Sequence, residues 1–145
     1  MKLENNLSFD SMLQKYEDQY NHEQLYWLRR GYDNGLDISL YANPAFDSMQ
    51  MHTIMYGLEN GVDATLYAFV EYHNFMMQVI YHLLANGARF SKYVIDDHLD
   101  VDAIMSDYDL LIKYKGYSRL STRAIDKIYD GAPYYTKERH NEIEG

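Results

Sequence analysis

The chain carries six histidines and 22 acidic side chains, the residue types from which metal sites and acid–base catalysis are built. No His-Glu-x-x-His pair occurs, and the nearest cluster, Glu71, His73 and His82, has no regular ligand spacing. The segment DDHLDVD at 96–102 lacks the glycine and the terminal glutamate of an EF-hand loop. We therefore predict structural or solvated histidines, no metal site and no cofactor.

Nucleophilic catalysis finds no better support. Cysteine is absent, no Gly-x-Ser-x-Gly motif occurs, and the serines fall at expected turn or cap positions. The recurring glycines follow predicted helices, whereas a phosphate-binding loop precedes its helix. The sequence therefore predicts a protein that is not an enzyme. A small hydrolase or a metal-binding protein is the least favoured alternative.

An acidic run is followed directly by a basic one. No Lys or Arg interrupts six aspartates: Asp96, Asp97, Asp100, Asp102, Asp107 and Asp109. Five basic residues come next, opposed only by Asp126: Lys113, Lys115, Arg119, Arg123 and Lys127. The aspartates are candidates for a face that docks a basic partner. The alternative is a solvated acidic face in which Asp100 or Asp102 caps the next helix.

Tyrosine is unusually frequent, with 16 residues among 145. Exposed tyrosine offers a large contact area at small entropic cost and is enriched at protein interfaces. We predict an aromatic binding face that includes Tyr26, Trp27, Tyr56 and Tyr81. The alternative is that these residues thicken the core.

These residues lie within an internal repeat. An Asn-Gly pair recurs at intervals of 26 residues, at Asn34-Gly35, Asn60-Gly61 and Asn86-Gly87. A tyrosine follows each glycine by six residues, at Tyr41, Tyr67 and Tyr93. Self-similarity at such a period is typical of a stacked solenoid, in which one repeat cannot bury its apolar face alone.

Each repeat predicts a helix, a stop and a short second helix. Asn21 and Asp47 each precede a glutamine by three residues, a loose capping box that indicates a helix start. The Asn-Gly pair indicates the helix end, because glycine takes the left-handed conformation without steric cost. A β-hairpin turn is the alternative, which the helical periodicity of the flanks disfavours. Hydroxyl residues suit the N-cap of the second helix, at Ser39, Thr65 and Ser91.

Two glycines fall inside the predicted first helices. Gly31 and Gly57 occupy positions where glycine costs about 1 kcal/mol relative to alanine. We expect the close approach of a neighbouring helix to require them. Leu83 stands at the equivalent place in the third repeat and predicts looser packing there, or packing against something else.

The predicted fold is all-α: a solenoid-like stack of about five short helix-turn-helix repeats in a single domain. Tyr41, Tyr67 and Tyr93 are expected to be buried at equivalent places. We assign 1–22 to an N-terminal cap, 23–48, 49–74 and 75–100 to repeats, 101–130 to a degenerate C-terminal unit and 131–145 to a flexible tail.

Composition and charge limit the function classes. The net charge is −9, and residues 1–100 carry 14 acidic and 6 basic side chains. This balance disfavours direct contact with nucleic acid, whose phosphates bind cationic side chains. No apolar stretch approaches the roughly 20 residues of a membrane helix, and the first 22 residues do not resemble a signal peptide. We therefore expect a cytoplasmic protein without membrane contact.

The strings GYDNGLDISLYANPAFDSMQM and GLENGVDATLYA resemble a short repeat, roughly G-L-x-x-G-L-D-V-S-x-Y-A, of poorly characterised proteins from Gram-positive bacteria, their phages and mobile elements. The resemblance covers about residues 23–93. The third repeat departs from it, with Leu83 in place of glycine and Arg89 in place of aspartate. The resemblance implies no catalytic residues. It implies a mobile-element context, in which small acidic proteins often inhibit host defence machinery.

The sequence thus favours a non-enzymatic, acidic helical-repeat module that binds a protein with a basic surface. The alternative is an inhibitor of a nucleic-acid-handling defence enzyme, similar to anti-CRISPR proteins, whose acidic surface occupies a cationic groove. Self-association into a homo-oligomer is a further possibility, because tyrosine-rich solenoid edges can pair.

Overall fold

The computed structural model describes residues 9–131. The predicted flexible tail, 131–145, lies outside the described residues except for Gly131. The chain divides into two compact units, Met1–Ala64 and Thr65–Gly145, which are described separately. Within the described residues the fold is mostly helical, with a single two-stranded sheet, in agreement with the predicted all-α class.

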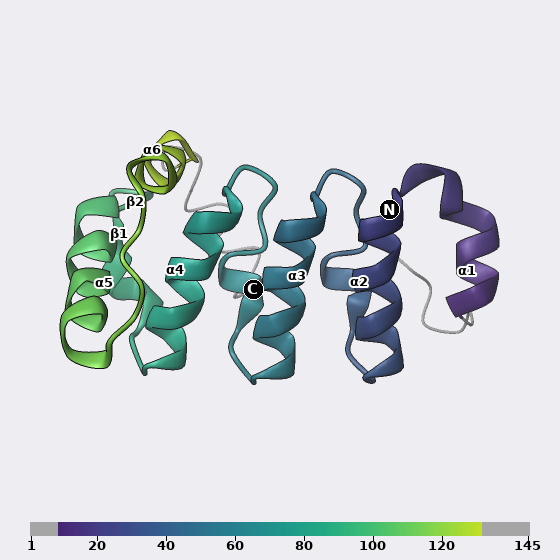
Figure 1. The fold of residues 1–145 in the computed structure, drawn as a ribbon, viewed down its shortest axis with the longest axis horizontal. Coiled ribbons are helices and arrows are strands. Elements are labelled where there is room, and N and C mark those ends of the chain that lie inside the picture. Colours follow the sequence, from purple (N-terminus) through teal and green to yellow (C-terminus); the bar gives the residue numbers. More distant parts are fainter. Residues whose placement is uncertain (1–8, 132–145) are drawn as a thin grey trace. The chain divides into compact units, whose positions relative to one another are not determined.

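The described part of the first unit contains three α-helices. They are α1 (Phe9–Tyr16), α2 (His22–Asp33) and α3 (Ser48–Glu59). Short 3₁₀ turns follow the first two, η1 (Glu17–Gln19) and η2 (Ile38–Leu40), and η3 (Ala64–Leu66) lies at the boundary of the units. Helices α2 and α3 lie side by side (Figure 1).

Capping boxes start α2 and α3, as predicted. At α2 the Gln24 amide donates to Asn21 Oδ1 at 2.8 Å, and the Asn21 amide donates to Gln24 Oε1 at 2.8 Å. Asp47 and Gln50 repeat the arrangement at α3. Gln24 has a second role, because its Nε2 donates to Phe46 O at 2.6 Å and so ties α2 to the loop before α3.

The Asn-Gly pairs end helices, also as predicted. Gly35 has a φ of 75°, its amide donates to Tyr32 O at 3.0 Å, and the Leu36 amide donates to Gly31 O at 3.0 Å. This pair of bonds is the Schellman motif, which satisfies the last carbonyls of a helix. The motif recurs after α3 and α4, where Gly61 and Gly87 have φ values of 72° and 91°.

The predicted short second helix of each repeat is a 3₁₀ turn of three or four residues. The predicted hydroxyl cap is wrong in the third repeat, where Arg89 is the N-cap of η4 (Phe90–Tyr93) and Ser91 lies inside the turn, and it is also wrong in the first repeat. Asp37 caps η2 instead, because its Oδ1 accepts from the Ser39 amide at 3.1 Å and from Ser39 Oγ at 2.6 Å. A carboxylate two residues earlier is the better acceptor for the free amides there.

Tyr41, Tyr67 and Tyr93 are fully buried, which confirms the prediction of burial. The reason for Gly31, however, differs from the expected contact with a neighbouring helix. A Cβ at Gly31 would collide with the Tyr41 hydroxyl, which donates to Trp27 O at 2.7 Å, and would meet Ile38 Cγ2 at 2.8 Å. Glycine therefore makes room for a tyrosine of the same repeat.

The second unit contains α4 (Asn74–Ala85), η4 (Phe90–Tyr93), α5 (Val101–Lys115) and α6 (Thr122–Gly131). Helix α4 packs against both α5 and α6. His73 caps α4, because its Nδ1 accepts from the Phe75 amide at 3.1 Å.

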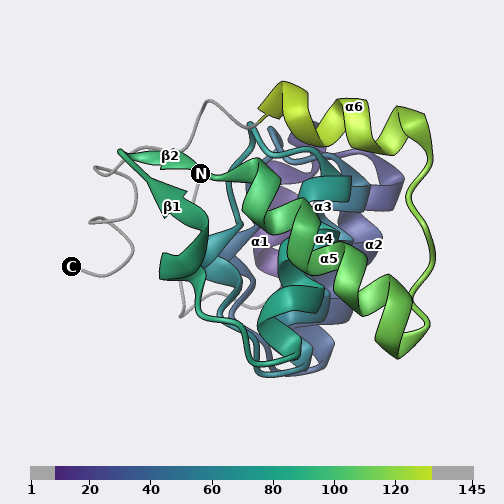
Figure 2. The ribbon, with the colours of Figure 1, turned by 90° about the vertical axis from the view of Figure 1, so that its left-hand side faces the viewer.

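A β-hairpin that was not predicted separates η4 from α5. Strand β1 (Val94–Ile95) pairs with β2 (His98–Leu99) in antiparallel register. The two turn residues, Asp96 and Asp97, have φ values of 50° and 67°. A two-residue turn with both φ values positive is type I′, which favours Asn-Gly. Figure 2 shows the hairpin at the start of α5, away from the segment that joins α5 to α6.

Candidate functional site

The six candidate aspartates do not share one environment. Asp96 and Asp97 are exposed at the hairpin tip. Asp100 caps α5 by accepting from the Ala103 amide at 3.1 Å, which matches one of the two roles predicted for it. Asp102 accepts from the Tyr129 hydroxyl at 2.8 Å, and this hydrogen bond raises the pKa of Tyr129.

Asp107 holds η4 to α5. Its Oδ2 lies 2.8 Å from Lys92 Nζ and accepts from the Tyr93 hydroxyl at 2.8 Å. The hydrogen bond from Lys92, assisted by that from Tyr93, lowers the pKa of Asp107. Its side chain is only 22% exposed. Leu83 stands where the first repeat has Gly31, and the hydroxyl of Tyr93 pairs with α5 instead of the preceding helix.

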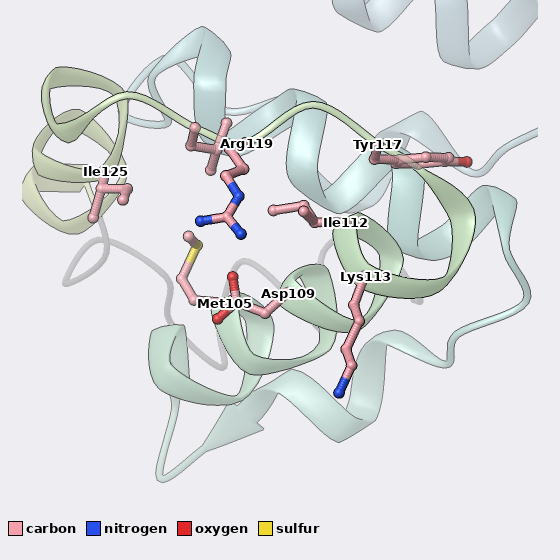
Figure 3. Close-up of a pocket in the computed structure, with 8 residues that line it drawn as sticks. Met105, Asp109, Ile112, Lys113, Tyr117, Arg119 and Ile125 are labelled. Atoms are coloured by element: carbon pink, nitrogen blue, oxygen red, sulfur yellow. The ribbon is translucent and has the colours of Figure 1, made fainter.

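Asp109, the last of the six, lines a groove between α5 and α6 of about 890 Å³. We call this cavity the α5–α6 groove. Its lining combines apolar and charged side chains: Met105, Asp109, Ile112, Lys113, Tyr117, Arg119, Leu120 and Ile125. The Asp109 carboxylate and the Arg119 guanidinium point toward one another across it (Figure 3). The predicted boundary between acidic and basic runs thus forms the rim of a cavity.

Three of the four predicted aromatic residues gather on the outer side of α2 and α3. Trp27 stacks on His52, with ring centroids 4.1 Å apart and planes 9° apart. Tyr26 meets the Trp27 ring edge-on at 4.7 Å, and Tyr56 lies 6.2 Å from the His52 ring. Tyr26 and Tyr56 are 56% and 45% exposed. We call Tyr26, Trp27, His52 and Tyr56 the aromatic surface.

Two charged residues adjoin the aromatic surface. The Arg30 guanidinium lies 5.7 Å from the centre of the Trp27 ring. Burial lowers the pKa of His52, and the positive charge of Arg30 lowers it further, against an opposing effect of Glu59. The imidazole is therefore neutral at pH 7, which suits a stack on the indole ring.

Tyr81, the fourth predicted member, lies in the second unit and is only 8% exposed. Its ring meets His82 edge-on at 5.1 Å. The period of 26 residues relates Tyr81 to Met55, which is also buried. The same period relates both residues to Arg29, which is exposed, so the repeat alone does not separate Tyr81 from the exposed tyrosines.

Sequence reasoning missed His52 and Arg30. The period carries a signal for both, because His52 corresponds to Tyr26 and Arg30 corresponds to Tyr56. Within each helix the two positions are four residues apart and share a face. The pair on α2, Tyr26 and Arg30, is exposed, whereas on α3 only Tyr56 is exposed and His52 is half-buried.

Between residues 9 and 131, no group of three or more His, Asp or Glu side chains is arranged to hold a metal ion. The described helices also include none with the length and apolar character needed to cross a bilayer.

Comparison with known proteins gives no relative. No family model matches the chain, and neither a curated protein nor a solved structure is significantly similar to it. The resemblance to the short bacterial repeat stays a prediction, and the function has to be argued from the geometry of the two units.

Proposed function

We propose that the chain is a non-enzymatic module that binds a basic protein through the aromatic surface. The observation that carries the proposal is the stack of Trp27 on His52, flanked by the exposed rings of Tyr26 and Tyr56. Large aromatic side chains left in water on two neighbouring helices are typical of interfaces.

The aromatic surface is ordered before a partner arrives. The stack fixes Trp27 and His52 against each other across α2 and α3. Tyrosine and tryptophan have few rotatable bonds, so little conformational entropy is lost on binding. A partner therefore meets a rigid set of rings.

Charge favours a basic partner. The first unit carries ten acidic and four basic side chains. The negative charge of Glu59 partly opposes the lowering of the His52 pKa, which places a carboxylate near the rings. A guanidinium from a partner could stack on Tyr26 or Tyr56 and be attracted to Glu59, an arrangement that suits arginine.

The alternative, inhibition of a nucleic-acid-handling enzyme by the acidic face, has weaker support. Asp100, Asp102 and Asp107 are engaged by groups of the protein itself. Asp96 and Asp97 are exposed at the hairpin tip, and Asp109 is exposed on α5.

The solenoid-like stack remains the proposed framework for this module. Small-angle X-ray scattering tests it, because stacked repeats give a longer particle than a globule of the same mass. A scattering curve that fits a sphere would contradict the stack and leave the aromatic surface unaffected.

The test of function is capture from a bacterial lysate with three proteins: the wild type, the double variant Tyr26→Ala/Tyr56→Ala and the control Tyr114→Ala. Tyr114 is 71% exposed and lies outside the aromatic surface. The variant Tyr114→Ala therefore controls for the loss of an exposed tyrosine elsewhere on the chain. We expect basic proteins to be retained by the wild type and the control and lost by the double variant.

Calorimetry with a purified captured protein makes the test quantitative. Removal of two interface rings should weaken binding by about 2 kcal/mol or more, roughly 30-fold. Equal affinity of the double variant and the wild type would rule out the aromatic surface as the site. Capture of acidic proteins alone would rule out the proposed partner class.

A further inference from the structure

The α5–α6 groove, of about 890 Å³, is a cavity that the proposed function does not use. Four of its lining residues are apolar: Met105, Ile112, Leu120 and Ile125. A cavity of about 890 Å³ that is lined by apolar and charged side chains is of the size that accommodates several side chains of a ligand. The groove therefore has the character of a docking site.

The rim of the groove carries an excess of positive charge. Lys113 and Arg119 line it, against the single carboxylate of Asp109. This local excess contrasts with the net charge of −9 of the whole chain. The groove therefore favours an occupant that combines an apolar side chain with carboxylates.

The hairpin of the same unit presents such a combination. Ile95 is 54% exposed, and Asp96 and Asp97 follow it at the tip. A type I′ turn directs these three residues into a compact projection.

One copy of the chain cannot place its hairpin in its own groove. The hairpin precedes Asp100, the N-cap of α5, whereas Lys113 lies in the last turn of that helix. A helix of 15 residues is about 22 Å long. Figure 2 shows the hairpin at the opposite end of α5 from the segment that carries Arg119.

We propose that the hairpin tip of one copy docks in the α5–α6 groove of a second copy. Ile95 contacts the apolar lining residues, and Asp96 and Asp97 pair with Lys113 and Arg119 of the other copy. Two different surfaces meet, so the contact is head-to-tail. Repetition of this contact gives a ring if the rotation between copies closes and an open chain if it does not. Because the contact is small, we expect dissociation constants of roughly 10 µM to 1 mM.

Sedimentation and light scattering over a concentration series test the proposal. The wild type should show a mean mass that rises with concentration and falls with added salt, because exposed ion pairs are screened. The variant Asp96→Asn/Asp97→Gly removes both carboxylates and supplies the residue pair that a type I′ turn prefers. It should fold at least as stably as the wild type and stay monomeric.

Loss of association in this variant would be specific to the tip. The substitution removes two negative charges from a chain of net charge −9 and so reduces general repulsion between copies. The groove variant Lys113→Glu/Arg119→Glu should also be monomeric. Its matched control is Arg123→Glu/Lys127→Glu, which reverses two exposed charges on α6 that do not line the groove and should keep the association.

A mixture of the two monomeric variants is the decisive experiment. The hairpin variant retains an intact groove, and the groove variant retains an intact hairpin. Head-to-tail docking therefore predicts that the mixture forms a 1:1 dimer and nothing larger. A mixture that stays monomeric would overturn the proposal, as would a wild type that stays monomeric up to about 1 mM.

The variant Asp109→Asn is expected to strengthen the association between copies. The Asp109 carboxylate faces Arg119 and competes with the incoming aspartates (Figure 3). Its removal should tighten the association about two- to fivefold, the range expected for one exposed ion pair. Weaker association would contradict the assigned role of Arg119. None of these variants touches the aromatic surface, so this proposal and the proposed function fail independently.

Discussion

Gly31 shows how one missing side chain positions a whole repeat. The Tyr41 hydroxyl reaches the α2 backbone at Trp27 through the space that a Cβ would fill. Tyr41 is fully buried, and burial raises the pKa of its hydroxyl. The hydrogen bond to Trp27 O therefore satisfies a group that would otherwise be costly to bury.

We predict that Gly31→Ala lowers the free energy of unfolding by about 2 to 3 kcal/mol, because the methyl group displaces the hydroxyl and breaks its hydrogen bond. Urea unfolding of the single variants and of Gly31→Ala/Tyr41→Phe measures the coupling. The double variant should be more stable than the sum of the single changes by about 1 kcal/mol. Additive effects would show that the two groups do not compete for space.

The Trp27–His52 stack gives a second prediction at this scale. Trp27 is the only tryptophan of the chain, so its fluorescence reports directly on His52. Protonated imidazole quenches a stacked indole. Because burial and Arg30 lower the pKa of His52, the quenching should have a midpoint below pH 6.5.

The sign of the accompanying stability change follows from linkage. A histidine with a lowered pKa in the folded state contributes stability above its unfolded pKa of about 6.5, and this contribution is lost as the pH falls through the folded value. Arg30→Gln should move the fluorescence midpoint upward, and His52→Gln should abolish the transition. A wild-type midpoint at or above 6.5 would contradict the environment described for His52.

At the scale of elements, some features depend on residues that are close in sequence, and others depend on tertiary contacts. The capping boxes and the Asn-Gly stops were predictable because the interacting atoms lie within a few residues of each other. The hairpin was not, because its turn is Asp-Asp, and neither residue is a strong signal for positive φ. The aromatic surface was predictable only in part, since the Trp27–His52 stack depends on α2 and α3 being neighbours.

Gln24 makes both a local capping box and a tertiary hydrogen bond to Phe46 O. The variant Gln24→Glu separates the two contributions. Glutamate is an ideal capping-box residue, so helix α2 itself should not suffer. It cannot donate to Phe46 O, however, and it places a carboxylate beside that carbonyl. We predict a loss of about 1 to 3 kcal/mol at pH 7.

The loss should shrink as the pH falls and the new carboxyl group gains a proton, because the protonated form can donate again. Thermal unfolding at pH 7 and pH 4.5 measures both effects. Unchanged stability at pH 7 would show that the bond to the following loop contributes nothing.

At the scale of the whole molecule, charge sets the rate at which partners meet. The net charge is −9, and basic side chains are scarce before residue 101. A cationic partner is therefore attracted over distances comparable to the Debye length, about 10 Å at 0.1 M salt. Stacking on the aromatic rings acts only at contact.

Long-range charge attraction and stacking on the aromatic rings predict different responses to salt. Raising the salt concentration from about 0.05 M to about 0.5 M should slow association with the basic partner about tenfold or more and leave dissociation nearly unchanged. Tyr26→Ala/Tyr56→Ala should instead speed dissociation. Stopped-flow kinetics separates the two rates, and a salt effect confined to dissociation would contradict electrostatic steering.

Leu83 has a consequence for how such a chain could grow. In the first repeat the tyrosine is held by its own helix, whereas in the third repeat Leu83 fills the glycine position and the Tyr93 hydroxyl bonds to Asp107 of α5. A duplication of residues 23–48 would reproduce the hydrogen bond from the tyrosine hydroxyl to its own helix in each copy. A duplication of residues 75–100 would leave every copy but the last without its aspartate. A copy of residues 23–48 therefore carries both partners of its tyrosine hydrogen bond, whereas a copy of residues 75–100 needs α5 to supply one of them.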